Sequence, residues 1–526
     1  MSLLKNKSRL NKKERSLSMG TILRKISIAL VIPLTFAGCG GSTTKSSSSL
    51  PVIQGTIPAD QVGSADHNYP FAAGEAVPDG TFEKYGYVEQ EFFMQGTANV
   101  YNLPAPTGIA DAIQAPTATV VTSGHPYKTR LIVRRPTDPS KFNGTVIVEW
   151  ANVTSGYENA DIWQGAHAYL INNGYAFVEV SAQNAGITAT PNGLKSWSAA
   201  RYGSLDVTDG GKVTADGLSF DIFSQAGAAI KANNGNLMGG LPVKLVLATG
   251  ESQSAEYVSM YLNAVHPLAN VFDGGILTKG GEIIRPDLNI PVMKILSESE
   301  FQDVSGGTLD QQTIIRPDRE STGPRGAGGY RTWEVAGTSH ADAYSLLTRA
   351  PSLLRDLSIS AELGCTLPGY SQIPFHYVLD KGIDAIVSWI VSGTAPAHAP
   401  SLTIQSVSPL TLARDSNGNA LGGIRLPQFA VPVATNTGIN SGPGLCVLRG
   451  SHVPFVAAAA DNDGNYLGNP ALPGSLYPSL SAYVSAIQAA GTALYNQGFM
   501  LQDSVTESVS DAQNGISPNA ANGTTP

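Results

Sequence analysis

One stretch decides the fold of this chain: Val246-Leu247-Ala248-Thr249-Gly250-Glu251-Ser252-Gln253-Ser254. The mostly apolar run 243–248 that leads into it is typical of a short buried strand. Apolar residues then recur at helical spacing over 255–262, which predicts a helix directly after Ser254. A strand that enters a helix through Gly-x-Ser-x-small is the nucleophile-elbow pattern, in which a sharp turn exposes the serine hydroxyl. The simpler alternative is that Ser252 only caps the helix.

The fifth position of this pattern departs from the usual one. Ser254 stands where most elbows have a second glycine. Because Gly250 and Ser254 are both small, the helix can still pack close to the strand. The helix N-terminus behind Ser252 also favours negative charge that develops there.

Strand and helix patterns alternate along most of the chain. Partial alternation of apolar and polar residues predicts half-buried strands at 87–94 and 128–134. Continuous apolar runs and amphipathic segments predict further strands at 145–148, 175–180, 271–277, 291–296 and 331–336, and helices at 161–172, 220–232, 255–265, 377–391 and 476–498. The alternation favours an α/β fold with a mostly parallel central sheet and helices on both faces.

The C-terminal part has a different composition. Segment 401–470 is rich in Pro and Gly, and we expect it to be an irregular elaboration of the core and not an independent domain. Residues 504–526 are mainly Ser, Asn, Ala, Gly and Thr, which predicts a disordered tail. The folded domain is therefore expected at 61–503.

The N-terminus has the pattern of an export signal. Basic residues precede the apolar run Ile26–Phe36, which is too short to span a bilayer comfortably, and Ala37-Gly38-Cys39 follows. We therefore expect a signal peptide at 1–38, with Cys39 the lipidated first residue of an exported chain. Cleavage without lipidation and translation from Met19 are alternatives. The Gly- and Ser-rich residues after Cys39 predict a flexible tether at 39–60.

Charge and cysteine content limit the partners and the compartment. The 526 residues hold 33 Lys and Arg against 41 Asp and Glu, a net charge of -8, which argues against nucleic-acid binding. A membrane is expected to be contacted only through the lipid anchor. With Cys39 assigned to lipidation, Cys365 and Cys446 could form a disulfide in an exported chain or remain free thiols. No metal-ligand spacing, phosphate loop or dinucleotide fingerprint is present, so we expect no metal and no cofactor.

A serine nucleophile needs a base, and the base needs an orienting acid. His340 follows the predicted strand 331–336 and comes after Ser252 in the order that this fold requires. Glu300 follows the predicted strand 291–296, so both side chains are expected at the carboxyl edge of the sheet. Among the eight histidines the reserve base is His452; the competing acids are Glu298 and Asp303.

The developing oxyanion needs backbone donors. The N–H of Gln253, the residue after the nucleophile, is expected to be one. The second should come from the loop after the predicted strand 145–148, with Ala151 and Asn152 as candidates.

These residues together resemble the α/β-hydrolase superfamily, from about Gln90 to Gln502. Within it, the chain is similar to a bacterial family named for its alpha/beta hydrolase domain. The resemblance rests on the segments 148–153, 250–254, 297–300, 333–342, 422–427 and 498–501. It implies a serine hydrolase with a Ser-acid-His triad, acting on carboxylic esters of small molecules.

Three other functions remain open from the sequence. The same triad supports acyl transfer to an alcohol and the hydrolysis of amides. A non-catalytic surface lipoprotein on a degenerate hydrolase fold is the third, with 401–470 as its binding surface.

Overall fold

The computed structural model describes residues 50–57, 69–75, 81–107, 113–301, 318–360, 364–367, 369–455 and 477–514. The predicted signal peptide, Cys39, Asp303 and residues 515–526 lie outside these ranges, as does most of the predicted tether.

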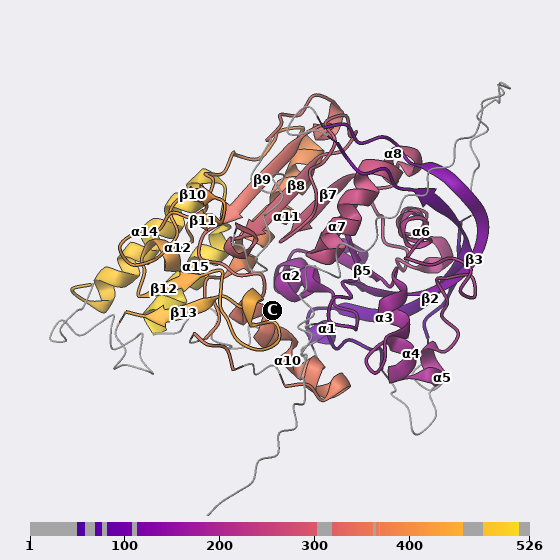
Figure 1. Ribbon diagram of the computed structural model, residues 1–526, viewed down its shortest axis with the longest axis horizontal. Coiled ribbons are helices and arrows are strands. Elements are labelled where there is room, and N and C mark those ends of the chain that lie inside the picture. The colour runs from indigo at the N-terminus through magenta and orange to yellow at the C-terminus, as the bar shows by residue number, and fades with distance from the viewer. Residues whose placement is uncertain are drawn as a thin grey trace, which may run out of the picture.

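A single nine-stranded sheet organises the described residues (Figure 1), in the order β1-β2-β3-β5-β4-β6-β7-β8-β9. Strands β1 to β3 are antiparallel, β3 pairs antiparallel with β5, and β5 through β9 run parallel. The strands are β1 (Val52–Gln54), β2 (Tyr87–Asn102), β3 (Thr119–Pro136), β4 (Thr145–Trp150), β5 (Ala176–Val180), β6 (Leu245–Glu251), β7 (Gly274–Thr278), β8 (Val292–Ser297) and β9 (Tyr330–Val335). The predicted parallel α/β sheet is therefore confirmed.

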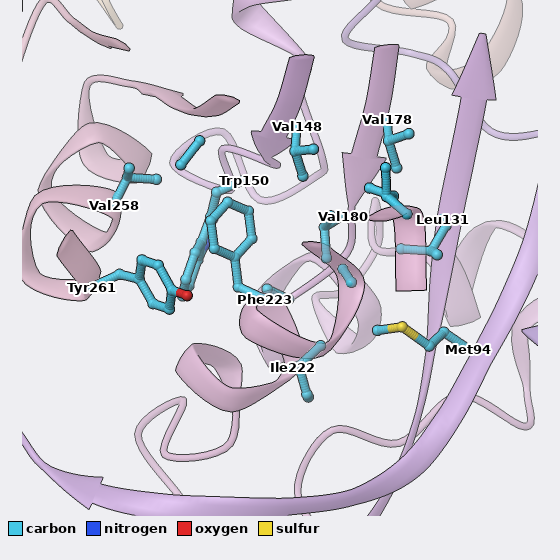
Figure 2. Close-up of a cluster of buried hydrophobic side chains, with 14 of the residues drawn as sticks. Met94, Leu131, Val148, Trp150, Val178, Val180, Ile222, Phe223, Val258 and Tyr261 are labelled. Atoms are coloured by element: carbon cyan, nitrogen blue, oxygen red, sulfur yellow. The ribbon is translucent and has the colours of Figure 1, made fainter. Parts of the chain in front are cut away.

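Helices cover both faces of the parallel strands, which explains the continuous apolar runs. In β4, Val148 and Trp150 face α6 (Ser219–Lys231) and α7 (Gln253–Met260), where Phe223 and Val258 pack around the indole (Figure 2). Ile147 points to the other face, beneath α2 (Asp161–Asn172) and α11 (Phe375–Ser392). Shorter helices are α1 (Thr81–Lys84), α3 (Asn184–Thr188), α4 (Leu194–Trp197), α5 (Ala199–Tyr202) and α8 (His266–Ala269), with single turns at Pro139–Lys141, Asn234–Asn236 and Pro324–Gly326.

The N-terminal boundary differs from the prediction. Val52–Gln54 was expected in the tether but forms the edge strand β1, which pairs with β2. Ile53 packs against the turn at Gly235, and the Ile57 N–H donates to the Glu91 carbonyl at 2.9 Å. These contacts with the body of the protein explain why a segment next to the Gly- and Ser-rich stretch is ordered here.

The C-terminal elaboration packs beside β9, at the opposite end of the sheet from β2 and β3 (Figure 1). A parallel bridge joins Val335 of β9 to Ile424. The elements are β10 (Ile404–Val407), β11 (Leu410–Leu412), α12 (Pro427–Ala430), β12 (Ala434–Thr437), the turn η9 (Cys446–Leu448), β13 (Ser451–Pro454) and α14 (Leu480–Gln497). This agrees with the prediction that the segment is attached to the core.

The predicted disordered tail begins too early. Residues Gln502–Asn514 form a helix, α15, although their composition is polar. Val505, Ser508 and Ala512 are buried at helical spacing, and Val505 lies where a Cβ on Gly491 of α14 would touch it. Because only one narrow stripe is apolar, the composition of the segment hides the helix.

No helix among the described residues is long and apolar enough to cross a membrane.

Hydrogen exchange can test α15. We expect the amides of 502–514 to be protected, and Val505→Asp to speed their exchange by roughly tenfold or more because it buries a charge against α14. Thr506→Asp, on the exposed side of the same turn, is the matched control and should change little. Rapid exchange of these amides in the unaltered protein would contradict the helix.

Candidate active site

Ser252 occupies a strained turn between β6 and α7. Its φ is 57° and its ψ is -124°, a conformation that a non-glycine residue adopts only when its surroundings impose it. The Ser252 N–H donates to the Thr278 carbonyl at 2.9 Å, which fixes the turn to the end of β7. A Cβ on Gly280 would lie 2.7 Å from the Ser252 carbonyl oxygen, so the next loop approaches as closely as glycine allows. Such strain at an exposed hydroxyl is the geometry of a nucleophile elbow.

The serine at the fifth position of the pattern has a local role. Ser254 Oγ accepts a hydrogen bond from the Glu251 N–H at 3.0 Å and donates to the Glu251 carbonyl at 2.9 Å. A Cβ on Gly250 would lie 2.7 Å from the Ser254 carbonyl, so strand and helix touch there. Ser254 therefore fits this close contact and also ties the turn together.

His340 and Glu300 are brought together by two neighbouring strands. His340 lies in the loop after β9, and Glu300 lies in the turn η7 (Glu298–Phe301) after β8. Glu300 Oε1 is 2.8 Å from His340 Nδ1, and Glu300 Oε2 accepts from the Ser297 N–H at 2.7 Å. The His340 N–H donates to Ser299 Oγ at 2.9 Å, so backbone and ring are both held. The carboxylate thus fixes one ring nitrogen and leaves Nε2 for chemistry.

The alternative acid and base have other partners. Glu298 is fully buried, accepts from the Gly337 N–H at 2.8 Å and pairs with Arg414 at 2.8 Å. His452 lies in β13, with Nδ1 2.9 Å from Asn436 Oδ1. Glu298 therefore joins the elaboration to the core, and neither residue lines the pocket that holds Ser252.

The backbone donors predicted for the oxyanion differ in availability. The Gln253 N–H lies at the first position of α7, and no residue in the described ranges accepts a hydrogen bond from it. The Ala151 N–H donates to the Val180 carbonyl at 3.2 Å, and the Asn152 N–H donates to the Asn159 carbonyl at 2.9 Å. Both candidates for the second backbone donor are therefore already used. The loop after β4 is closed by a local pairing with Asn159 that the sequence did not reveal.

The side chain of Asn152 offers a different donor. Its Nδ2 donates to the Glu251 carbonyl at 2.9 Å, and its Oδ1 accepts from the Thr154 N–H at 2.9 Å. An amide nitrogen carries two hydrogens, so one remains. Asn152 lines the same pocket as Ser252.

A pocket of about 150 Å³ contains Ser252 and His340 together. Its other charged and titratable lining residues are Asp161, Glu251, Lys279, Asp342, Tyr344, Arg349, His376 and Arg449. Sequence reasoning missed most of these. Lys279 could have been found, because it follows a predicted strand as His340 does, whereas Arg349 and Arg449 follow no such pattern.

Buried charges surround the elbow. Glu251 Oε1 pairs with Lys279 Nζ at 3.2 Å, and Glu251 Oε2 accepts from Thr278 Oγ1 at 2.9 Å. Burial, and then the charge of Glu251, raise the pKa of Asp161 to about 7. Burial likewise raises the pKa of Asp342, whose Oδ1 caps α10 (Ala343–Leu357) by accepting from the Ser345 N–H at 2.9 Å. In the described residues no cluster of three or more His, Cys, Asp or Glu side chains is arranged to hold a metal ion.

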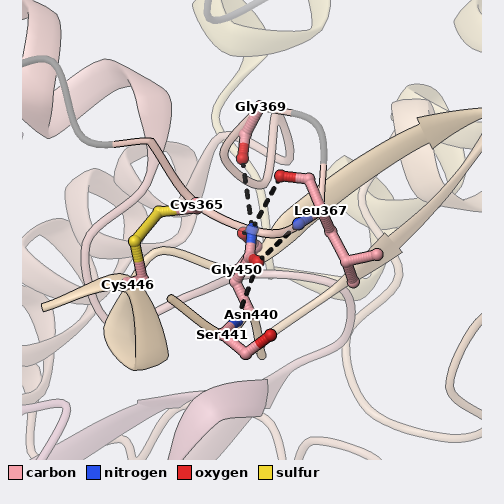
Figure 3. Close-up of a disulfide and its surroundings, with 7 residues drawn as sticks. All are labelled: Cys365, Leu367, Gly369, Asn440, Ser441, Cys446 and Gly450. Atoms are coloured by element: carbon pink, nitrogen blue, oxygen red, sulfur yellow. Dashed lines mark hydrogen bonds between the residues drawn. A yellow bond between two sulfur atoms is a disulfide. The ribbon is translucent and has the colours of Figure 1, made fainter. Parts of the chain in front are cut away.

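A disulfide holds one wall of the pocket. Cys365 and Cys446 are bonded, with their Cα atoms 5.5 Å apart, and Asn440 ties the neighbouring loops by donating to the Leu367 and Gly450 carbonyls (Figure 3). Leu445, just before the turn that begins at Cys446, and Leu448, its last residue, line the pocket. The C-terminal elaboration therefore contributes directly to the candidate site.

Two solved structures are similar to part of this chain at low identity. XC6422 from Xanthomonas campestris, described as an a/b serine hydrolase without lid, is 16% identical over 44% of this chain and 88% of its own, with a TM-score of 0.26. LpqC, a poly(3-hydroxybutyrate) depolymerase from Bordetella parapertussis, is 14% identical over 44% of this chain and 87% of its own, with a TM-score of 0.25. No curated protein matches the sequence significantly.

The family assignment comes from the sequence as a whole. The family model described as "Alpha/beta hydrolase domain" matches residues 55–510. This range includes the elbow at Ser252, the turn that carries Glu300 (the acid turn), the loop that carries His340 (the histidine loop) and the C-terminal elaboration. The chain belongs to this alpha/beta hydrolase domain family.

Proposed function

We propose that the protein is an exported serine hydrolase that cleaves carboxylic esters through an acyl-enzyme. The observation that carries the proposal is the hydrogen bond between His340 Nδ1 and Glu300, in a loop that opens on the same pocket as the strained Ser252. A helix cap would need neither the strain nor a histidine oriented by a carboxylate.

The proposed reaction has two half-reactions, acylation of Ser252 and deacylation, and His340 acts first as a base and then as an acid in each. Ser252 Oγ attacks the acyl carbon while His340 Nε2 takes its proton, and Glu300 stabilises the imidazolium. The tetrahedral intermediate then expels the alcohol, which receives the proton from His340. Water then attacks the acyl carbon of the acyl-enzyme while His340 takes its proton. The bond to Ser252 Oγ breaks, His340 returns the proton to that oxygen, and the carboxylic acid leaves.

We propose the Gln253 N–H and the Asn152 side chain as the two oxyanion donors. The Gln253 N–H is free at the start of α7, and Asn152 Nδ2 keeps one hydrogen after its bond to Glu251. This replaces the second backbone donor that the sequence predicted.

We also propose export, with removal of residues 1–38 and lipidation at Cys39. The Cys365–Cys446 bond supports an oxidising compartment, because disulfides persist there. Cells fed a labelled fatty acid test the lipid. The unaltered chain should carry the label on a gel, and Cys39→Ser should not.

Removing the nucleophile should abolish activity. The purified protein should react with a fluorophosphonate and hydrolyse p-nitrophenyl acetate and butyrate. Ser252→Ala should lose the label and lower kcat on the order of a thousandfold or more. A protein that neither labels nor turns over ester would favour the binding-lipoprotein function.

Variants of Glu298 and Glu300, which lie two residues apart, distinguish the acid that orients His340 from a glutamate with a structural role. Glu300→Gln leaves only one oxygen; with that oxygen on the Ser297 N–H, an uncharged NH2 faces His340 Nδ1 and favours the wrong tautomer, so kcat should fall on the order of a thousandfold with the fold intact. Glu298→Gln loses its ion pair with Arg414, so it should lower the melting temperature and keep most of kcat. Kinetics and thermal melts of both variants are the measurement, and the reverse pattern would reassign the acid.

Asn152 can be tested by separating its donor from its acceptor. Asn152→Ala should lower kcat about a hundredfold with little change in KM, because the lost contact forms only in the transition state. Asn152→Asp keeps an oxygen for the Thr154 N–H but has no hydrogen to donate, so it should be at least as impaired. If the Asp variant keeps full kcat, Asn152 supports the loop only.

A further inference from the structure

Two arginines line the pocket without an ion pair to any carboxylate of the residues that the structure describes. Arg349 comes from α10, and Arg449 directly follows the turn η9; both line the pocket with Ser252 and His340. Arg449 is only 5% exposed, and its Nε and Nη1 atoms are buried without a hydrogen-bond acceptor in the described part of the chain. The Nε atom of Arg349 is likewise buried without a hydrogen-bond acceptor in the described residues. Neither guanidinium lies within 4.0 Å of a described carboxylate oxygen.

Other buried arginines, by contrast, form ion pairs with glutamates. Arg130 pairs with Glu158 at 2.7 Å, and Arg201 pairs with Glu91 at 2.6 Å. An unpaired buried charge is costly, and a chain keeps one where a ligand completes it. The contrast marks the Arg449 site as incomplete without a bound anion.

The acids of the pocket are engaged elsewhere. Glu251 pairs with Lys279, and Asp342 caps α10; Glu300, behind the lining, holds His340. Asp161 feels the charge of Arg349 but forms no ion pair with it. Burial, and then the neighbouring charge of Arg349, lower the pKa of Arg449 to about 10, so Arg449 is still a cation at neutral pH.

We propose that Arg349 and Arg449 bind a carboxylate of the substrate, so that the natural substrate is an ester that also bears a free carboxylate. The inference rests on the proposed esterase function and names its substrate class. A guanidinium fork matches a planar carboxylate and can bind both oxygens. The acidic groups that also line the pocket would repel a phosphate dianion more strongly than a single carboxylate.

The backbone holds this anion site at a fixed place relative to the catalytic groups. The Ala341 N–H, next to His340, donates to the Leu448 carbonyl at 2.9 Å. The Ser371 N–H donates to the Arg449 carbonyl at 3.1 Å, and the disulfide at Cys446 anchors the start of the turn. A substrate carboxylate bound there would position its ester group in the pocket of Ser252.

Matched esters test the proposal. The substrates are 4-nitrophenyl hydrogen adipate and 4-nitrophenyl hexanoate, which have the same acyl length and differ in a terminal carboxylate. Arg449→Met and Arg349→Met should each lower kcat/KM on the adipate by about tenfold to a hundredfold, chiefly through KM, because charge-assisted hydrogen bonds are lost. The loss on hexanoate should be at least about tenfold smaller, and Arg449→Lys should recover part of the adipate activity.

The controls separate this inference from the esterase function. Lys212→Met removes a cation that is 73% exposed and does not line the pocket, and it should not change the preference between the two esters. If the protein hydrolyses hexanoate but shows no preference for adipate, or if the arginine variants lose both substrates equally, the anion site is refuted and the esterase stands.

A binding measurement tests the anion site in the case where the protein hydrolyses neither ester. Calorimetry on Ser252→Ala should detect monomethyl adipate at an affinity at least about tenfold above that of neutral dimethyl adipate, and Arg449→Met should abolish the difference. This result would support the anion site even if no ester were cleaved. Equal affinities for the two esters would overturn it.

Discussion

The close approach of backbone segments around Ser252 is the constraint on which the rest of the site depends. A positive φ at a serine persists only where the surrounding structure repays its cost. Here β7 accepts the Ser252 N–H, Gly250 admits the start of α7, and Gly280 brings the following loop against the Ser252 carbonyl. Since β6 and its neighbours are fully buried, the turn cannot relax without disturbing the centre of the sheet.

The histidine loop and the acid turn follow β9 and β8 of the same sheet, and contacts of Glu298 and Glu300 hold them together. Glu298 accepts from the Gly337 N–H and pairs with Arg414, while its neighbour Glu300 orients His340. One glutamate of this turn thus contacts the ring, and the other binds the loop that carries the ring and the elaboration behind it. Two carboxyls two residues apart in one short turn therefore have different roles.

Local patterns predicted what local physics determines. The elbow, the parallel strands and the order Ser252, Glu300, His340 all follow from apolar runs and turn residues within a few positions of each other. Contacts between distant segments were not predictable in this way. The pairing of Asn152 with Asn159 uses one backbone donor that was expected for the oxyanion, the Asn152 N–H, and α15 is ordered by a narrow stripe against α14. Arg449 reaches the pocket only because the elaboration folds back over the histidine loop.

The Cys365–Cys446 bond has a consequence for when the site becomes complete. The segments that carry Ser252, Glu300 and His340 are held by the sheet and need no covalent link. The turn before Arg449 is anchored by a bond that forms only under oxidising conditions. Assembly of the reactive groups therefore belongs to folding, whereas assembly of the wall beside them belongs to oxidation. In a reducing compartment Ser252, Glu300 and His340 would take their places while the wall beside them still lacked its covalent link, so the two maturation steps are separable in time.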